Sequence, residues 1–117
     1  MSSVTGDSAV LARVRDAVAQ AIEERRGLVA FSRLEAVEMD RRARAVERDA
    51  LDQVRRLVPV AGTDQQLDQV RLRLVRLDAA LEELNVRQDV PEPSRGLERD
   101  DITWRAFEDI SWLLGLT

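Results

Sequence analysis

The sequence contains no cysteine, histidine, lysine or tyrosine, and these absences exclude several kinds of chemistry. Without cysteine there is no disulfide framework and no thiolate metal site. Without histidine and lysine, the commonest general base and the Schiff-base amine are missing. The Glu-x-x-His unit of di-iron helical bundles is missing as well. All 18 basic residues are arginine, which we interpret as the mark of a G+C-rich, bacterial or phage coding sequence.

Phosphate-binding loops and long apolar runs are also absent. The chain has no GxxxxGK[ST] or GxGxxG motif and no apolar stretch long enough to span a bilayer. Its first ten residues lack a basic region followed by an apolar one, so we expect a cytoplasmic protein with no membrane contact. Paired carboxylates, at Glu23 and Glu24 and at Glu35 and Glu38, are typical of solvated helix faces. We therefore expect no enzymatic activity, no cofactor and no metal ion.

Helical periodicity dominates what is present. A first helix is predicted from a cap at Asp7 or Ser8 to a stop at Gly27, or through it, with an apolar stripe of Leu11, Val14, Val18, Ala21 and Ile22. A second is predicted from the capping-box pair Ser32 and Glu35, with Phe31 as a hydrophobic staple, to Pro59. Its stripe contains Ala36, Met39, Ala43, Val46, Ala50, Leu51, Val54, Leu57 and Val58.

The segment "LDQVRLRLVRLDAALEEL", residues 67 to 84, contains a short strand-like alternation within a longer helical repeat. Its leucines and valine recur at alternating spacings of three and four over 18 residues, at Leu67, Val70, Leu74, Leu77, Leu81 and Leu84. A strand seldom exceeds ten residues, so the helical period prevails. A third helix is thus predicted, capped by Thr63 with Gln66. The short "PVAGT" connection should make it an antiparallel hairpin with the second helix.

This helix leaves apolar residues on its opposite side, namely Leu72, Val75, Ala79 and Val86. Either the first helix and the C-terminal segment cover them, which would make the third helix the buried centre of a four-helix arrangement, or another chain does, as in an oligomer. In the second case these four residues form a self-association surface.

The C-terminal part of the chain differs in composition. Residues 89–101 contain two prolines and a glycine and are predicted to be a linker, followed by an amphipathic helix in residues 102–117 that Gly115 ends. Residues 89–117 contain three arginines and seven acids, a net charge of −4, and three of the four aromatic residues. We predict that Trp104, Phe107 and Trp112 bind a protein partner, because tryptophan is enriched at binding hot spots and Trp112 falls on the polar helix face. Alternatively, the segment folds back over Leu72 and Val75.

An arginine cluster on the second helix suggests a different function. Arg41, Arg42, Arg44 and Arg48 lie on adjacent faces, as in a small DNA-binding regulator or antitoxin. Residues 33–58, however, hold seven arginines against six acids, a net charge of only +1. A protein that neutralises several phosphates normally has an uncompensated basic face, so nucleic-acid binding is the less favoured hypothesis.

Together these patterns predict an all-α fold. We expect an antiparallel helical hairpin or coiled-coil-like bundle of three long helices in residues 1–88, with a short C-terminal helix, as one domain overall. The favoured function is that of a non-enzymatic adaptor or structural subunit that self-associates and binds a protein partner.

Overall fold

The computed structural model describes residues 2–31, 35–58, 64–87 and 89–116, with the side chains of residues 2–7 and 31 left out. Four helices make up nearly all of these residues, and no strand occurs among them, which confirms the all-α prediction. They are α1 (Ser2–Phe31), α2 (Ala36–Leu57), α3 (Gln65–Val86) and α4 (Glu92–Leu113). None of the four, as far as it is described, combines the length and apolar character needed to cross a membrane.

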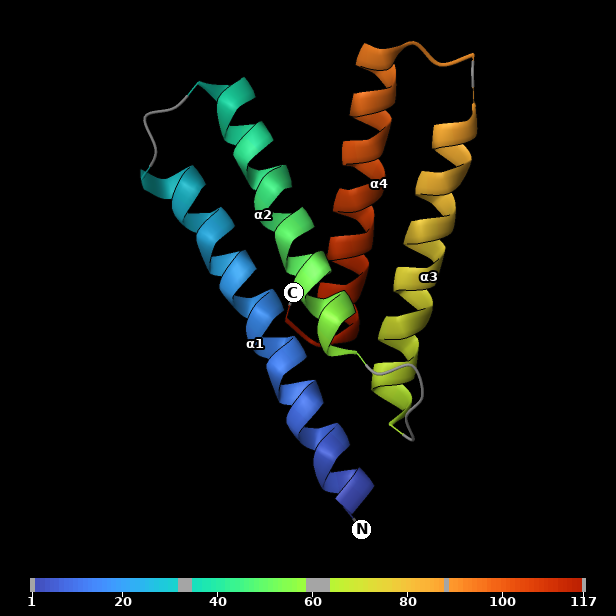
Figure 1. Cartoon of the computed structure of the whole chain (residues 1–117). Helices are drawn as coiled ribbons and strands as arrows, with labels where there is room; N and C mark the ends of the chain where they lie inside the picture. The colour runs from blue at the N-terminus through green and yellow to red at the C-terminus, as the bar shows by residue number, and fades with distance from the viewer. Residues whose placement is uncertain (1, 32–34, 59–63, 88, 117) are drawn as a thin grey trace.

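The helices pack as two hairpins. Figure 1 shows α1 beside α2 and α3 beside α4, with the chain reversing direction from each helix to the next. The two hairpins meet mainly where α4 packs against α2, so the spatial order is α1, α2, α4, α3. Helices α2 and α3, expected to pack as a hairpin, touch only sparsely. The reason is that the leucine stripe of α3 packs with the apolar face of α4 instead.

The apolar core is concentrated at one end of the molecule. Each helix contributes to it, and the buried cluster consists of Val14, Ala17, Val18, Ala21, Ile22, Ala50, Leu51, Val54, Leu67, Val70, Leu74, Leu77, Phe107, Ile110 and Leu114. At the other end the hairpins diverge, as the upper part of Figure 1 shows. The Cα radius of gyration, 15.6 Å, accordingly exceeds the roughly 13 Å of a compact domain of this length.

Helix α3 has the predicted period but is not the buried centre of the fold. Its inward stripe is buried at Leu67, Val70, Leu74, Leu77 and Leu84. The opposite side, with Leu72, Val75, Ala79 and Val86, remains exposed. The prediction that the C-terminal segment would cover this side is therefore wrong. That segment does pack on the rest of the chain, but on the leucine face of α3.

Helix α1 begins earlier than predicted and, of the two alternatives left open at Gly27, runs through the glycine. It begins at Ser2 rather than at Asp7 or Ser8, and it continues through Gly27 to Phe31. A glycine inside a helix costs about 1 kcal/mol relative to alanine, which weakens a helix without ending it. The packing of α1 against α2 outweighs that cost.

The helix starts also differ from the predicted capping boxes. Glu35 is the N-cap of α2 and makes no side-chain capping bond, while Ser32 lies outside the described residues. In α3 the cap is Asp64, whose Oδ1 accepts a hydrogen bond of 3.0 Å from the Leu67 amide. Thr63 also lies outside the described residues. Asp64 serves this role because its short carboxylate can reach a free amide in the first turn.

Helix α4 contains most of the segment predicted to be a linker. It is as long as α2 and α3, with Pro91 as N-cap and Pro93 in its first turn. Proline is compatible with these positions because its missing N–H would have no intrahelical partner there. The predicted stop at Gly115 is confirmed: its φ is 74°, and the Leu116 amide donates to the Ser111 carbonyl at 2.9 Å.

Three glycine positions allow a test of these helix bounds. A Cβ added at Gly27 or Gly96 meets no atom within 4 Å, so Gly27→Ala and Gly96→Ala should each raise the free energy of unfolding by about 0.5–1 kcal/mol. Gly115→Ala should lower it by about 1 kcal/mol, because alanine disfavours a positive φ. Urea denaturation measures all three. Destabilisation by Gly27→Ala would argue against a helix that continues through residue 27.

The two faces of α3 can be compared in the same way. Leu74→Ala should lower the free energy of unfolding by about 2–5 kcal/mol because it leaves a cavity in the core. Leu72→Ala, two residues earlier on the exposed side, should cost about 1 kcal/mol or less when measured in dilute protein. Equal costs would contradict the assignment of inner and outer faces.

Candidate functional site

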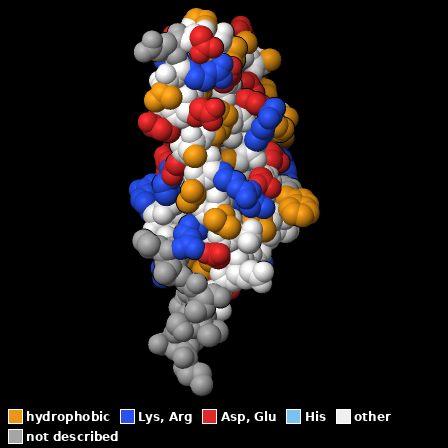
Figure 2. Space-filling model, turned by 90° about the vertical axis from the view of Figure 1, so that its right-hand side faces the viewer, with side chains coloured by type: hydrophobic (Ala, Val, Ile, Leu, Met, Phe, Trp, Pro, Cys, Tyr) orange, Lys and Arg blue, Asp and Glu red, His pale blue; other side chains and the backbone are white. Residues whose placement is uncertain are grey.

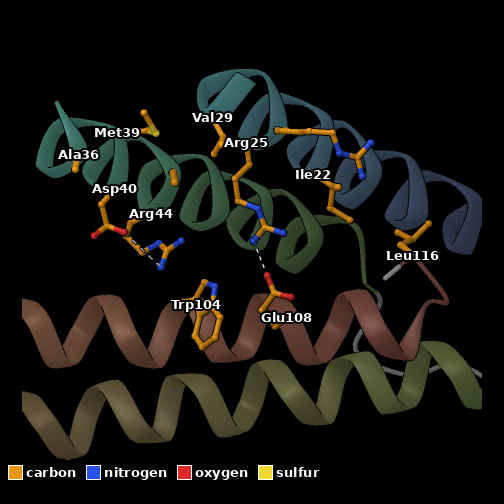
Figure 3. A pocket seen from close by; sticks show the side chains of 12 residues that line it. Ile22, Arg25, Val29, Ala36, Met39, Asp40, Arg44, Trp104, Glu108 and Leu116 are labelled. Atoms are coloured by element: carbon orange, nitrogen blue, oxygen red, sulfur yellow. Dashed lines mark hydrogen bonds and ion pairs between the residues drawn. The ribbon is translucent and has the colours of Figure 1, made fainter. Parts of the chain in front are cut away.

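The divergence of the two hairpins leaves an open cleft of about 1040 Å³. Figure 3 shows α1 and α2 forming one wall and α4 the other. Most of the lining is apolar, and charged side chains lie among it; the lining residues are Ile22, Arg25, Arg26, Val29, Ala36, Met39, Asp40, Ala43, Arg44, Trp104, Glu108 and Leu116. The cleft begins where the four-helix core ends.

Trp104 is the largest side chain in this cleft. It projects from α4 toward the opposite wall (Figure 3), and 37% of its surface is exposed. The Arg44 guanidinium carbon lies 5.9 Å from the centroid of its ring, at the outer limit of a cation–π contact. Met39 and Val29 belong to the facing wall, so the cleft presents apolar surface from both hairpins.

A buried carboxylate lies where the hairpins part. Glu47 of α2 is fully buried, and its Oε2 accepts hydrogen bonds from Arg25 Nη1 at 2.8 Å and from Arg44 Nη2 at 3.0 Å. Arg44 Nε approaches the other oxygen, Oε1, at 2.8 Å but at an angle unsuited to a hydrogen bond. Two cations thus compensate one enclosed carboxylate.

Arg25 also connects this carboxylate to the second hairpin. Its Nη1 lies 2.5 Å from Glu108 Oε1 on α4, and its guanidinium carbon lies 5.1 Å from the centroid of the Phe107 ring. One α1 side chain therefore contacts α2 and α4 together. Because Phe107 is fully buried, Arg25 rests on the edge of the apolar core.

Burial raises the pKa of Glu47 above its ordinary value, against the opposing hydrogen bond and charge of Arg25 and the charge of Arg44. The carboxylate does not line the open cleft, so it has no direct access to a bound molecule. The charged groups that do line the cleft are largely paired with one another. Among the described residues, no group of three or more acids is placed to hold a metal ion. The site is therefore suited to binding an apolar surface.

The three aromatic residues predicted to bind a partner lie in three different environments. Trp104 lines the cleft, whereas Phe107 is enclosed in the core and presents no surface to a partner. Trp112 is 70% exposed, as its place on the polar face indicated, but lies outside the cleft. Only Trp104 among them belongs to a shaped site.

Each arginine of the α2 cluster lies within ion-pair distance of an acid. Arg41 and Arg42 both pair with Glu38, at 3.5 and 3.3 Å. Arg44 pairs with Glu47, and Arg48 lies 3.7 Å from Asp100 of α4. The predicted carboxylate pairs are likewise surface features. Glu23 contacts Arg26 at 2.6 Å, and Glu24 and Glu35 are exposed.

Arg25, Glu47 and Glu108 were not among the predicted functional residues. The sequence contains one usable signal: Glu47 follows Ala43 by four residues and precedes Ala50 by three, which places an acid on the apolar stripe of α2. Arg25 and Glu108 carry no such signal because their meeting depends on how the hairpins pack.

Comparison with known proteins shows no matching family, no similar curated protein and no similar solved structure at a significant level. Inference about function therefore rests on the residues and geometry of this chain.

The raised pKa of Glu47 predicts a specific pH dependence of stability. A carboxyl whose folded pKa exceeds its unfolded pKa contributes stability that is present below the unfolded value, near 4.5, and is lost as pH rises through the folded value. Glutamine cannot titrate. The free energy of unfolding of the wild type minus that of Glu47→Gln should therefore decrease from pH 4 to pH 8.

Urea denaturation at several pH values measures this difference. Glu24→Gln, which removes the same charge from an exposed site on α1, controls for net charge. A difference that instead grows with pH would show that Arg25 and Arg44 stabilise the ionised carboxylate more than burial penalises it.

Proposed function

We propose that this chain is a non-enzymatic interaction protein: an adaptor or structural subunit that self-associates and binds a protein partner within a larger assembly. The observation that carries the proposal is the open apolar cleft between the hairpins, with Trp104 on one wall and Met39 and Val29 on the other. A tryptophan with free surface in a concave site is a typical centre of a protein–protein interface.

The size and shape of the cleft favour a polypeptide as its occupant. Small-molecule sites are about 300–1,000 Å³ and enclose most of the ligand. This cleft is at the upper end of that range and opens to solvent between the hairpins. An amphipathic helix or extended segment with an apolar face would bury Trp104 and Met39 together, as in helix-in-groove recognition.

The charges around the cleft support an apolar mode of binding. Arg25 pairs with Glu108 and Glu47, Arg26 pairs with Glu23, and Arg44 pairs with Glu47. A partner therefore finds few uncompensated charges and gains affinity chiefly by burying apolar surface. No observation favours the nucleic-acid alternative, because acids pair with Arg41, Arg42, Arg44 and Arg48.

Site-specific photo-crosslinking in cells that express the protein naturally tests this function. A benzophenone side chain placed at Trp104, and separately at Met39, should capture the same protein, because both residues line the same cleft. Met39→Glu should reduce capture from position 104 at least about tenfold, since binding would then bury an unpaired charge.

Val37→Glu is the matched control. Val37 lies two residues earlier on α2, is strongly exposed and does not line the cleft, so its replacement should leave capture unchanged. Partner binding in the cleft would be contradicted if positions 39 and 104 captured different proteins. It would also be contradicted if Met39→Glu and Val37→Glu reduced capture from position 104 equally.

A further inference from the structure

The outer side of α3 carries an apolar stripe that no part of the described chain covers. Leu72, Val75 and Val86 are 39%, 58% and 66% exposed, and Ala79 is exposed between them. At about 3.6 residues per turn, these four positions fall on one side of the helix, opposite the buried stripe. Figure 2 views the molecule from the side where α3 lies and shows apolar side chains running down it among charged ones.

Two residues of the stripe, Leu72 and Val86, lie at equal distances on either side of Ala79, whereas Val75 has no apolar counterpart. Leu72 precedes Ala79 by seven residues and Val86 follows it by seven, two helical turns in each direction. The small alanine thus lies at the midpoint, with a larger apolar residue near each end. If two copies pack antiparallel about a two-fold axis that lies between their Ala79 residues, Leu72 of one copy lies against Val86 of the other. The two alanines then meet where the helices approach most closely.

On one flank of the stripe, the charges are complementary under the same axis. Arg76 lies three residues before Ala79 and Glu83 lies four after it, and at about 100° per residue both fall on the same flank of the stripe. Neither side chain forms an ion pair among the described residues. The nearest cation along the helix from Glu83 is Arg87, and Arg87 pairs with Asp89 and Glu98. The flank therefore carries a positive charge toward the N-terminal half of the stripe and a negative charge toward the C-terminal half.

From this arrangement we infer that α3 pairs antiparallel with α3 of a second copy of this chain, with Ala79 at the crossing point and two symmetric ion pairs between Arg76 of one copy and Glu83 of the other. In a parallel two-fold pair, residues on the same flank of the two helices lie on opposite sides of the interface, so Arg76 of one copy could not reach Glu83 of the other. The two ion pairs therefore require the antiparallel arrangement. The inference deepens the self-association proposed above by naming the partner and the register.

The expected dimer is reversible. The stripe spans 15 residues from Leu72 to Val86, about 21 Å of helix. One helix pair of this length belongs at the small end of specific interfaces, which bury about 1,200 Å² or more in total. Association should therefore depend on protein concentration between about 10 μM and about 1 mM.

Charge reversal tests the register by analytical ultracentrifugation. Arg76→Glu and Glu83→Arg should each weaken the homodimer roughly tenfold, because each creates two like-charge contacts. The double variant should regain wild-type affinity to within about threefold, since its two ion pairs are merely inverted. An equimolar mixture of the two single variants should form a heterodimer, in which both contacts are again between opposite charges.

Arg13→Glu, which changes an exposed arginine of α1, is the matched control and should leave the dimer unchanged. A wild type that stays monomeric up to about 1 mM, or a dimer that neither single variant weakens, would overturn the inference. So would single variants whose mixture does not associate. Recovery in the mixture would also show that the single variants fold. Because these changes lie outside the cleft, their outcome is independent of partner binding at Trp104.

Discussion

The contact between Arg25 and the buried Glu47 determines how the rest of the molecule is arranged. An ionised carboxylate enclosed in protein is unfavourable unless cations and hydrogen bonds compensate it, and Arg25 and Arg44 provide both. Arg25 can do so only if α1 stays close to α2, and its second contact, with Glu108, brings α4 to the same point. The apolar core thus ends at a charged cluster, and the cleft begins on the other side of it.

The two faces of α3 show why a chain of this length leaves apolar surface exposed. A helix that is apolar on two opposite sides needs neighbouring helices on both sides to bury its apolar residues. In a four-helix fold, few neighbouring helices are available to do this. Here α4 covers the leucine side, and α1 and α2 contact α3 only sparsely. No helix is left to cover Leu72 and Val75. The exposed stripe is thus a consequence of the way the hairpins pack.

Much of the secondary structure could be predicted from the sequence, because helical periodicity and local stop signals are properties of short segments. The α3 stripe from Leu67 to Leu84, the stop at Gly115 and the exposure of Trp112 are of this kind. The errors arose where tertiary packing outweighed a local preference. Helix α4, for example, begins at Glu92 within the predicted linker. The candidate site was harder to predict, because the meeting of Arg25, Glu47 and Glu108 depends on contacts between three helices.

The concentration of the core at one end also bears on how the molecule opens. We expect backbone amides beside the buried Val18, Val54 and Leu74 to exchange with solvent only on global unfolding. Amides near Val29 and Met39 belong to the first hairpin beyond the core and can exchange when that end alone opens. We therefore expect the cleft end of the fold to have the lower opening free energy, so that it can open while the core remains intact.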